Sequence, residues 1–489
     1  MTNEFKIKNN LKYYSLYING EWIRSNSNKF IAVENPATEE IIGYVTDANQ
    51  DDVDAALVSS QQAQLKWQEL TILERADYLK RLGEALGEER EHFARLLTLE
   101  QGKTYTEALF EVQDTINYIT QAIEGAKRIK TEILPVMARD ESLIINRVPY
   151  GVTLGLCAWN YPLALVGRKL GPALLTGNTI IIKPHELTPI ATTEFFRIID
   201  KVGFPKGVIN LITCSGFEMG QYMVKSPIVR LSNVTGSVGA GQAIYKASSQ
   251  NISGLILELG GKSPFIVMED ADLDKAVEAA VISRYSNCGQ VCICCDMIFA
   301  HEKIAEEFTK KLLKRIEQIK IGNPFAPTTT MGPKMCKSDL EKIDSIVQKT
   351  ISEGAILLCG GKRPKGKEFE KGYWYEPTVL GNVTPEMTAA KDEIFGPVLP
   401  IIKIKSFDHA AEIANALPYG LSAYLFTENY RTLIKAQKVL EVGTIFMNKC
   451  IVGYTHGFHS GHKLSGLSGE DGEYGLEAYM QKKVCYIKY

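Results

Sequence analysis

The strongest constraint on the fold is an alternation of short apolar runs with helix-compatible segments between about residues 150 and 260. Apolar or β-branched runs bounded by glycine and proline predict buried strands at residues 152–158, 179–183, 208–213, 229–235, 254–259 and 265–268. Helix-compatible segments lie between several of them, at residues 163–175, 188–202, 216–226 and 238–249. Such an alternation is typical of parallel βαβ units. A weaker alternation continues from residue 272 to about 450, so the sequence predicts an α/β protein.

Other segments show helical periodicity or stand apart from both alternations. Apolar residues recur every three or four positions in four segments, which predicts helices at residues 52–70, 72–86, 104–126 and 304–319. Residues 129–148 predict two short strands around a charged turn, and residues 483–489 predict a final strand. Left-over strands of this kind either cover an edge of their own sheet or join the sheet of a partner chain. The pattern alone leaves both possibilities open.

Composition excludes several classes of protein. The 489 residues carry 55 Lys and Arg against 57 Asp and Glu, a net charge of −2, which gives no electrostatic reason to expect nucleic acid or an anionic membrane as partner. The longest uncharged stretch, residues 148–167, is interrupted by prolines and glycines and therefore does not predict a membrane span. The charged and amide-rich start does not resemble a secretory signal, so we expect a cytoplasmic protein.

Four of the ten cysteines fall within eight residues, at Cys288, Cys292, Cys294 and Cys295. Cys292 follows a predicted helix through a glycine-containing turn, where exposure and backbone N–H groups would lower the pKa of a thiol and make it a nucleophile. A buried structural cysteine is the plain alternative. Zinc is disfavoured, because the cluster lacks paired Cys-x2-Cys elements and a nearby histidine, so we predict no metal.

Polar residues at the ends of predicted strands are candidates for a site. Glu258 ends an apolar strand beside two glycines, where α/β proteins keep their clefts, and partial burial would suit it to act as a base. A salt-bridge role is the alternative. The turn from Thr235 to Gly241 offers Ser237 and a helix N-terminus to a phosphate, and Glu186 is a candidate acceptor for ribose hydroxyls. Each of these signals is weak by itself.

Taken together, the motifs are specific. In chain order they are Trp159-Asn160-Tyr161-Pro162, Lys183-x-x-Glu186, Thr235-Gly236-Ser237, Glu258-Leu259-Gly260-Gly261-Lys262, Gly289-Gln290-Val291-Cys292 and Glu393-Ile394-Phe395-Gly396-Pro397. This order resembles the NAD(P)-dependent aldehyde dehydrogenase superfamily. The resemblance also includes Tyr17-Ile18-Asn19-Gly20-Glu21-Trp22 and Lys463-Leu464-Ser465-Gly466, so that it covers nearly the whole chain.

The resemblance implies a role for each motif. Cys292 would attack the aldehyde to give a thiohemiacetal, and after hydride transfer Glu258 would activate the water that hydrolyses the thioester. Asn160 and the backbone N–H of Cys292 would form the oxyanion hole. The residues implied to bind the cofactor, expected to be NAD, are Trp159, Lys183, Glu186, Gly236, Ser237, Gly241, Glu393 and Phe395.

The resemblance also implies a domain arrangement. We expect a Rossmann-like cofactor domain at residues 1–127 and 148–258 and an α/β catalytic domain at residues 259–475. The two segments that fit neither alternation, at residues 128–147 and 476–489, match the family's β arm for oligomerisation. A homodimer or homotetramer is therefore expected.

Several positions depart from the family's usual pattern. Ala158 and Val234 replace a proline and a phenylalanine, and both changes concern packing. Arg168 and His459 stand where aromatic residues often line the aldehyde tunnel. This pair and the Gly-Phe-His-x-Gly run at residues 457–461 resemble the lactaldehyde and glycolaldehyde dehydrogenase branch. An apolar aldehyde would leave Arg168 unpaired in a dry channel, which is costly. Pairing of Arg168 with a carboxylate outside the tunnel is the alternative.

The predicted function is NAD-dependent oxidation of a small, hydroxylated aldehyde to its acid. Another aldehyde class, such as betaine aldehyde or succinate semialdehyde, is the alternative within the same chemistry. Acyl transfer to coenzyme A is disfavoured, because relatives with that activity lack the glutamate found at Glu258. A non-catalytic relative or a redox sensor built on the cysteine cluster is the alternative of a different class.

Overall fold

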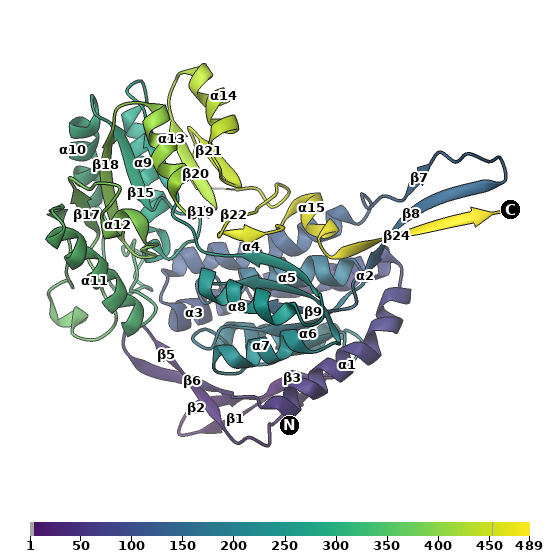
Figure 1. Cartoon of the computed structure of the whole chain (residues 1–489). Helices are drawn as coiled ribbons and strands as arrows, with labels where there is room; N and C mark the ends of the chain where they lie inside the picture. The colour runs from purple at the N-terminus through teal and green to yellow at the C-terminus, as the bar shows by residue number, and fades with distance from the viewer. Residues whose placement is uncertain (1–3, 452) are drawn as a thin grey trace.

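The computed structural model describes residues 4–451 and 453–489. Figure 1 shows two α/β bodies and a strand arm that projects away from them. Within the described residues, the larger sheets have eight and seven strands, and smaller sheets of four, three and two strands accompany them. The predicted α/β class is therefore confirmed.

The first body is built on the eight-stranded sheet, in the order β23-β13-β12-β9-β10-β11-β3-β4. Its parallel strands are β9 (Val152–Leu156), β10 (Thr179–Lys183), β11 (Ile209–Leu211), β12 (Val229–Thr235) and β13 (Gly254–Glu258). The helices between them are α5 (Ala164–Leu175), α6 (Ile190–Val202), α7 (Phe217–Lys225) and α8 (Val238–Ser248). All of these elements begin and end within two residues of the predicted bounds.

The order of these strands determines where a ligand can bind. From β9 the chain runs outward through β10 and β11, and it then returns to the other side of β9 to form β12 and β13. The carboxyl ends of β9 and β12 therefore lie beside each other at a topological switch point, where open α/β sheets form their ligand crevices. The antiparallel strands β3 (Leu16–Ile18), β4 (Glu21–Ile23) and β23 (Gly466–Leu467) complete the edges of the sheet.

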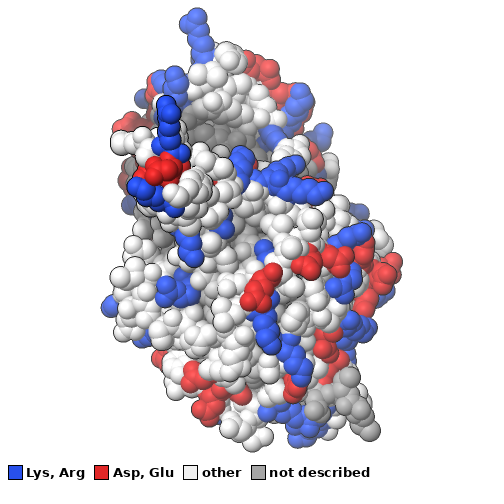
Figure 2. Space-filling view, turned by 90° about the vertical axis from the view of Figure 1, so that its right-hand side faces the viewer, with Lys and Arg blue, Asp and Glu red and all other residues white. Residues whose placement is uncertain are grey.

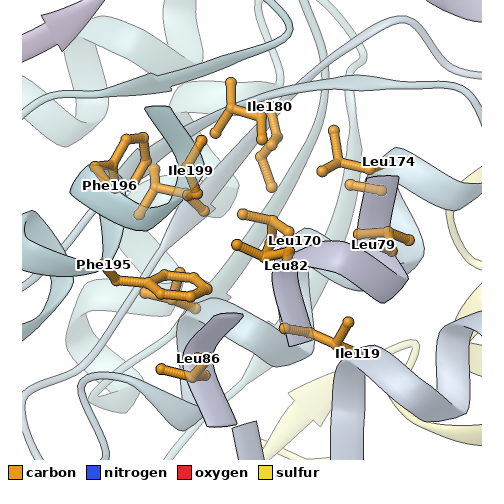
Figure 3. Packing of buried hydrophobic residues seen from close by; sticks show 14 of the residues in the cluster. Leu79, Leu82, Leu86, Ile119, Leu170, Leu174, Ile180, Phe195, Phe196 and Ile199 are labelled. Carbon is orange, nitrogen blue, oxygen red and sulfur yellow. The ribbon is translucent and has the colours of Figure 1, made fainter. Parts of the chain in front are cut away.

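A helical layer packs against this sheet. It contains α1 (Gln50–Glu69), α2 (Ile72–Glu88), α3 (Arg90–Gln101) and α4 (Tyr105–Gly125). Figure 3 shows Leu82 of α2, Ile119 of α4, Leu170 of α5 and Ile180 of β10 meeting in one apolar cluster, and each is at most 1% exposed. Burying a side chain of this size contributes about 1.5–3 kcal/mol. Three of the four helices were predicted, whereas α3 was not, because Glu89 gives it no side-chain N-cap.

The second body is built on the seven-stranded sheet, in the order β16-β17-β18-β15-β14-β20-β21. Its strands are β14 (Pro264–Val267), β15 (Met297–His301), β16 (Ile356–Cys359), β17 (Thr378–Gly381), β18 (Val398–Ile404), β20 (Ser422–Phe426) and β21 (Thr444–Met447). Its helices are α9 (Leu273–Tyr285), α10 (Ala305–Ile316), α11 (Lys337–Ser352), α12 (Thr388–Lys391), α13 (Phe407–Ala416) and α14 (Tyr430–Val439), with short 3-10 turns η1 (Ser286–Gly289) and η2 (Lys367–Phe369).

A small N-terminal sheet was not predicted. It consists of β1 (Phe5–Lys8), β2 (Leu11–Tyr14), β6 (Glu40–Thr46) and β5 (Phe30–Asn35). Lys12 and the Tyr14 hydroxyl donate to Glu194 of α6, each at 2.7 Å, and so attach this sheet to the first body. These partners lie about 180 residues apart in the chain, beyond the range of a local sequence signal.

The arm consists of β7 (Glu132–Leu134), β8 (Glu141–Pro149) and β24 (Met480–Lys488). β8 and β24 are antiparallel and pair along their whole length, from Pro149 opposite Met480 to Glu141 opposite Lys488. The three strands predicted for these segments are therefore present. Figure 1 shows the arm extending beyond the body of the molecule, and it leaves apolar side chains such as Ile133 (75% exposed) and Tyr486 (83% exposed) in solvent.

The chain returns to the first body before it enters β24. β23 pairs with β13, and α15 (Gly472–Glu477) packs against α4 and α5. The last part of the range expected for the catalytic domain, residues 259–475, thus lies against the first body, and the expected domain boundaries stay a prediction. Before β23, the strands β19 (Tyr419–Gly420) and β22 (His462–Lys463) form a two-stranded sheet.

In the described part of the chain, no helix is both long enough and apolar enough to cross a bilayer. Figure 2 shows Lys and Arg side chains interspersed with Asp and Glu on the face toward which the arm points.

Candidate active site

A cavity of about 390 Å³ lies at the carboxyl ends of the parallel strands of the first body and is also lined by residues of the second. Its lining includes the residues that follow β9, β10, β12 and β13, together with Cys292, Glu393 and Phe395. The three predicted catalytic residues and seven of the eight predicted cofactor residues therefore line one cavity: Cys292, Glu258, Asn160, Trp159, Lys183, Glu186, Gly236, Ser237, Glu393 and Phe395.

Gly241 is the predicted cofactor residue that is outside this lining. A Cβ atom at Gly241 would lie 2.4 Å from Cδ1 of Leu259. The glycine is therefore needed for close packing of α8 against the end of β13, and nothing in the lining supports a direct contact with a ligand.

The loop that carries Cys292 has a strained backbone. Asn287, Cys288 and Gly289 have φ values of 47°, 56° and 72°, which lie in the left-handed region. A Cβ at Gly289 would lie 2.3 Å from the carbonyl oxygen of Gly396, so only glycine fits there. The Gln290 side chain holds the loop, because its Oε1 accepts from the Met335 N–H at 2.8 Å and its Nε2 donates to the Asn287 carbonyl at 2.9 Å.

The four cysteines of the cluster differ in accessibility. Cys288, Cys294 and Cys295 are at most 3% exposed, whereas Cys292 is half-buried and lines the cavity. The thiol of Cys294 accepts a hydrogen bond from Arg284 at 3.1 Å. Of the four, Cys292 alone lines the cavity.

The expected lowering of the thiol pKa is wrong for Cys292 in this structure. Burial, with the negative charge of Glu258 nearby, raises the pKa of the Cys292 thiol to about 12. The backbone N–H groups of the turn do not compensate for this desolvation. Cys292 is therefore a protonated thiol at neutral pH, and its activation requires a base or a new positive charge in the cleft.

Glu258 ends β13 and is 4% exposed. Nε2 of His459 lies 3.1 Å from Oε2 in an ion-pair contact, and neither carboxylate oxygen has a well-formed hydrogen bond among the described residues. Burial raises the pKa of Glu258, and a positive charge on His459 opposes that shift. A carboxylate left without donors is suited to accept a proton from a water molecule.

Asn160 is held by both its side chain and its backbone. Nδ2 donates to the Gln290 carbonyl at 3.1 Å, and the Asn160 carbonyl accepts from Lys103 at 2.9 Å and from the Asn287 side chain at 3.0 Å. One N–H of the amide is thus used inside the protein, and the second has no partner among the described residues. This arrangement suits an oxyanion donor, a role that stays a prediction.

The cavity lining fits a dinucleotide. Ser237 is the N-cap of α8, whose first N–H groups form an anion site. Oε2 of Glu186 accepts from the Gly216 N–H at 2.7 Å. Glu393 accepts from the Gly261 N–H at 2.9 Å, and burial raises the pKa of Glu393 to about 7. The rings of Trp159 and Phe395 meet edge to face at 5.4 Å. Phosphate donors, ribose acceptors and apolar faces are all present.

Arg168 does not face the cavity as an unpaired donor, so this part of the expectation is corrected. Its Nε donates to Asp471 at 2.7 Å, and its Nη1 lies 3.2 Å from Glu470. The paired guanidinium no longer provides a reason why an apolar aldehyde would be excluded. His459 also lies outside the lining of the cavity, and it contacts Glu258 instead.

Several residues of the lining were missed by the sequence reasoning. They are His185, Phe217, Lys334, Asp339 and Lys342, among others. His185 is adjacent to a motif that was found, whereas Lys334 and Asp339 lie in a segment with no motif of its own. Only the packing of the second body against the first brings that segment to the cleft.

The sequence and the fold match known proteins over nearly their whole length. Residues 22–485 match the model of the aldehyde dehydrogenase family. The chain therefore belongs to the aldehyde dehydrogenase family, and it is an NAD(P)-dependent aldehyde dehydrogenase. The fold class and the enzyme class predicted from the sequence are thus confirmed.

Particular relatives refine the comparison. The chain is 42% identical to 3,6-anhydro-alpha-L-galactose dehydrogenase of Vibrio sp. (strain EJY3), covering 98% of this chain and 100% of that one. It is 37% identical to lactaldehyde dehydrogenase of Escherichia coli (strain K12), covering 97% and 98%. It is also 37% identical to D-glyceraldehyde dehydrogenase (NADP(+)) of Picrophilus torridus, covering 97% and 96%.

Solved structures of the same enzymes superpose closely. A structure of 3,6-anhydro-L-galactose dehydrogenase in complex with NAP has a TM-score of 0.96 at 42% identity and covers 98% of this chain and 100% of that one. A crystal structure of lactaldehyde dehydrogenase from Escherichia coli has a TM-score of 0.95 at 37% identity and covers 98% and 99%.

A first prediction concerns the nucleophile. Replacing Cys292 by Ala should reduce NADH formation by more than about a thousandfold, because no other thiol of the cluster reaches the cavity. Binding of NAD, followed by calorimetry, should persist in this variant. Cys294→Ala is the matched control and should keep most of the activity. Loss of activity in the control with activity retained in Cys292→Ala would contradict the assignment.

A second prediction concerns the pH dependence of thioester hydrolysis. Because a positive charge on His459 lowers the pKa of Glu258, His459→Asn should raise that pKa further. The rate of the step after the NADH burst rises as Glu258 loses its proton, so its midpoint should move to higher pH in this variant. The exposed His456, in the same segment, provides the control His456→Asn, which should leave the midpoint unchanged. An unchanged midpoint in His459→Asn would refute the coupling.

Proposed function

We propose that this protein uses NAD to oxidise a small, hydroxylated aldehyde to the carboxylic acid. The observation that carries the proposal is the meeting of Cys292, Glu258 and Asn160 in one cavity with a lining suited to a dinucleotide. The names of three relatives support the substrate class, since anhydrogalactose, lactaldehyde and glyceraldehyde all carry hydroxyl or ether oxygens close to the aldehyde.

The residues divide the reaction between them. The thiol of Cys292 loses its proton to water as its sulfur adds to the aldehyde carbon, and the second N–H of the Asn160 amide stabilises the oxyanion of the thiohemiacetal. A bound nicotinamide ring supplies the hydride acceptor. The remaining thioester is attacked by water, whose proton passes to the carboxylate of Glu258, and the acid leaves as the Cys292 thiol is restored.

The charged side chains around Arg168 favour a neutral substrate over an anionic one. Arg168 already has two carboxylate partners, Asp471 and Glu470, and Glu258 lies near them. The carboxylate of succinate semialdehyde would meet an arginine whose charge is compensated. Hydroxyl groups need only one donor or acceptor, and the ring of His459 beside Glu258 provides a polar group at this point.

Three further proposals concern the oligomeric state, the cellular location and the cysteines around Cys292. The exposed apolar side chains of the arm and its open strand edges support the expected homodimer or homotetramer, because such surfaces are usually covered by a partner. The cytoplasmic location expected from the sequence remains a prediction. So does a redox role for the buried cysteines that surround Cys292.

A third prediction concerns the preference for NAD over NADP. Glu186 is held by the Gly216 N–H at the cavity, where a 2′-phosphate would bring like charge against it. We expect kcat/KM for NAD to exceed that for NADP by about tenfold or more, and Glu186→Gln to reduce this ratio. The positive charge of Lys183 nearby offsets part of the repulsion between Glu186 and the 2′-phosphate.

One of the relatives, D-glyceraldehyde dehydrogenase (NADP(+)) of Picrophilus torridus, is named for NADP, so the two cofactors need to be compared directly. Measured dissociation constants for both cofactors separate binding from turnover. Equal kcat/KM values for NAD and NADP in the natural enzyme would contradict the proposal.

A fourth prediction concerns the aldehyde. Lactaldehyde and glycolaldehyde should have kcat/KM values up to about tenfold above those of hexanal and benzaldehyde, the range that one hydrogen bond provides. His459→Phe should narrow this ratio. Because a change in Glu258 affects all aldehydes alike, the ratio isolates recognition of the hydroxyl group. A preference for hexanal, or for succinate semialdehyde, would overturn the proposed substrate class.

A further inference from the structure

Lys334 differs from the other deeply buried lysines of this protein. Among the described residues, four lysines are at most 2% exposed: Lys103, Lys169, Lys262 and Lys334. Three of them have a carboxylate partner, namely Glu111, Glu470 and Asp296 respectively. Lys334 has no carboxylate within 4.0 Å in the described part of the chain. A buried ammonium without a counter-charge is costly, so its retention calls for a reason.

The surroundings of Lys334 point into the cofactor cavity. Nζ donates to the carbonyl of Phe395 at 2.5 Å and lies 5.8 Å and 5.9 Å from the ring centres of Trp159 and Phe395. Both rings and Lys334 itself line the cavity. An ammonium group has three N–H donors, and one acceptor is accounted for here. Lys334 therefore has donors left in the lining of the cavity that also contains Cys292.

Several titratable groups near Lys334 affect its charge. Burial lowers the pKa of Lys334, while Asp339 opposes that shift and Lys342 adds to it. The thiols of Cys288 and Cys336 also act on Lys334, and like Asp339 they oppose the lowering of its pKa. In the absence of a ligand, the positive charge of Lys334 is thus compensated only in part.

We propose that Lys334 is a cofactor-binding residue that gains its counter-charge from the dinucleotide and binds the reduced form more tightly than the oxidised form. The inference rests on the proposed use of NAD. The oxidised nicotinamide ring is cationic and the reduced ring is neutral, whereas both forms carry the same phosphates. In a cleft of low dielectric, a lysine beside Phe395 and Trp159 attracts the phosphates of both forms but repels only the cationic ring.

The test compares the dissociation constants of NADH and NAD in the natural enzyme and in Lys334→Met, measured by calorimetry. A charged hydrogen bond corresponds to about 10–100-fold in affinity, so NADH binding should weaken by about tenfold or more, and NAD binding by less. Lys334→Arg keeps the charge and should keep most of the preference for NADH. Lys262→Met is the matched control, since Lys262 is equally buried but is paired with Asp296 and is not in the cavity lining.

The melting temperature without cofactor distinguishes binding from a structural role. Removing an uncompensated buried charge should leave the melting temperature of Lys334→Met unchanged or higher, whereas Lys262→Met should melt lower because it leaves Asp296 with fewer partners. An unchanged ratio of NADH to NAD affinities in Lys334→Met would overturn the inference, whatever its melting temperature. Failure of the natural enzyme to bind either form would instead overturn the proposed function.

Discussion

The buried carboxylate of Glu470 is the interaction on which the rest of the site depends. It accepts from Lys169 at 3.0 Å and from Asn233 at 2.7 Å, and it lies 3.2 Å from Arg168. Although burial opposes ionisation, Lys169 and Arg168 hold the pKa of Glu470 well below its usual value. Its backbone also pairs with that of His459, which places the imidazole against the base. Removing one partner from such a buried cluster costs about 3–5 kcal/mol.

The strained backbone of the loop that carries Cys292 is a second constraint. Polar groups hold this loop in its conformation. Asn287 is kept in the left-handed region by its contacts with the Asn160 carbonyl and, through its N–H, with Glu107 at 2.6 Å. Each such residue costs about 1–3 kcal/mol and persists only where its surroundings determine it. Here those surroundings come from both bodies, so the position of Cys292 requires that they pack together.

Burial shifts the titration of the ionisable groups of the cleft in one common direction, away from their charged forms. Burial raises the pKa of the Cys292 thiol, of Glu258 and of Glu393, and it lowers the pKa of Lys334. A substrate or cofactor that brings a compensating group therefore favours the charged forms. A site of this kind couples binding to activation, because desolvation is offset only in the occupied cleft.

The sequence alone determined the α/β class, the strands and helices of the first body and the set of residues at the strand ends, because apolar periodicity and turn chemistry act over a few neighbouring positions. Parallel strands then bring their carboxyl ends together, which is why Asn160, Ser237 and Glu258 meet in the cavity. Only the tertiary structure decided the pairing of Arg168 with Asp471, 303 residues away, and the burial that raises the pKa of Cys292. Ion pairing and desolvation depend on neighbours in space, and these neighbours are distant in the chain.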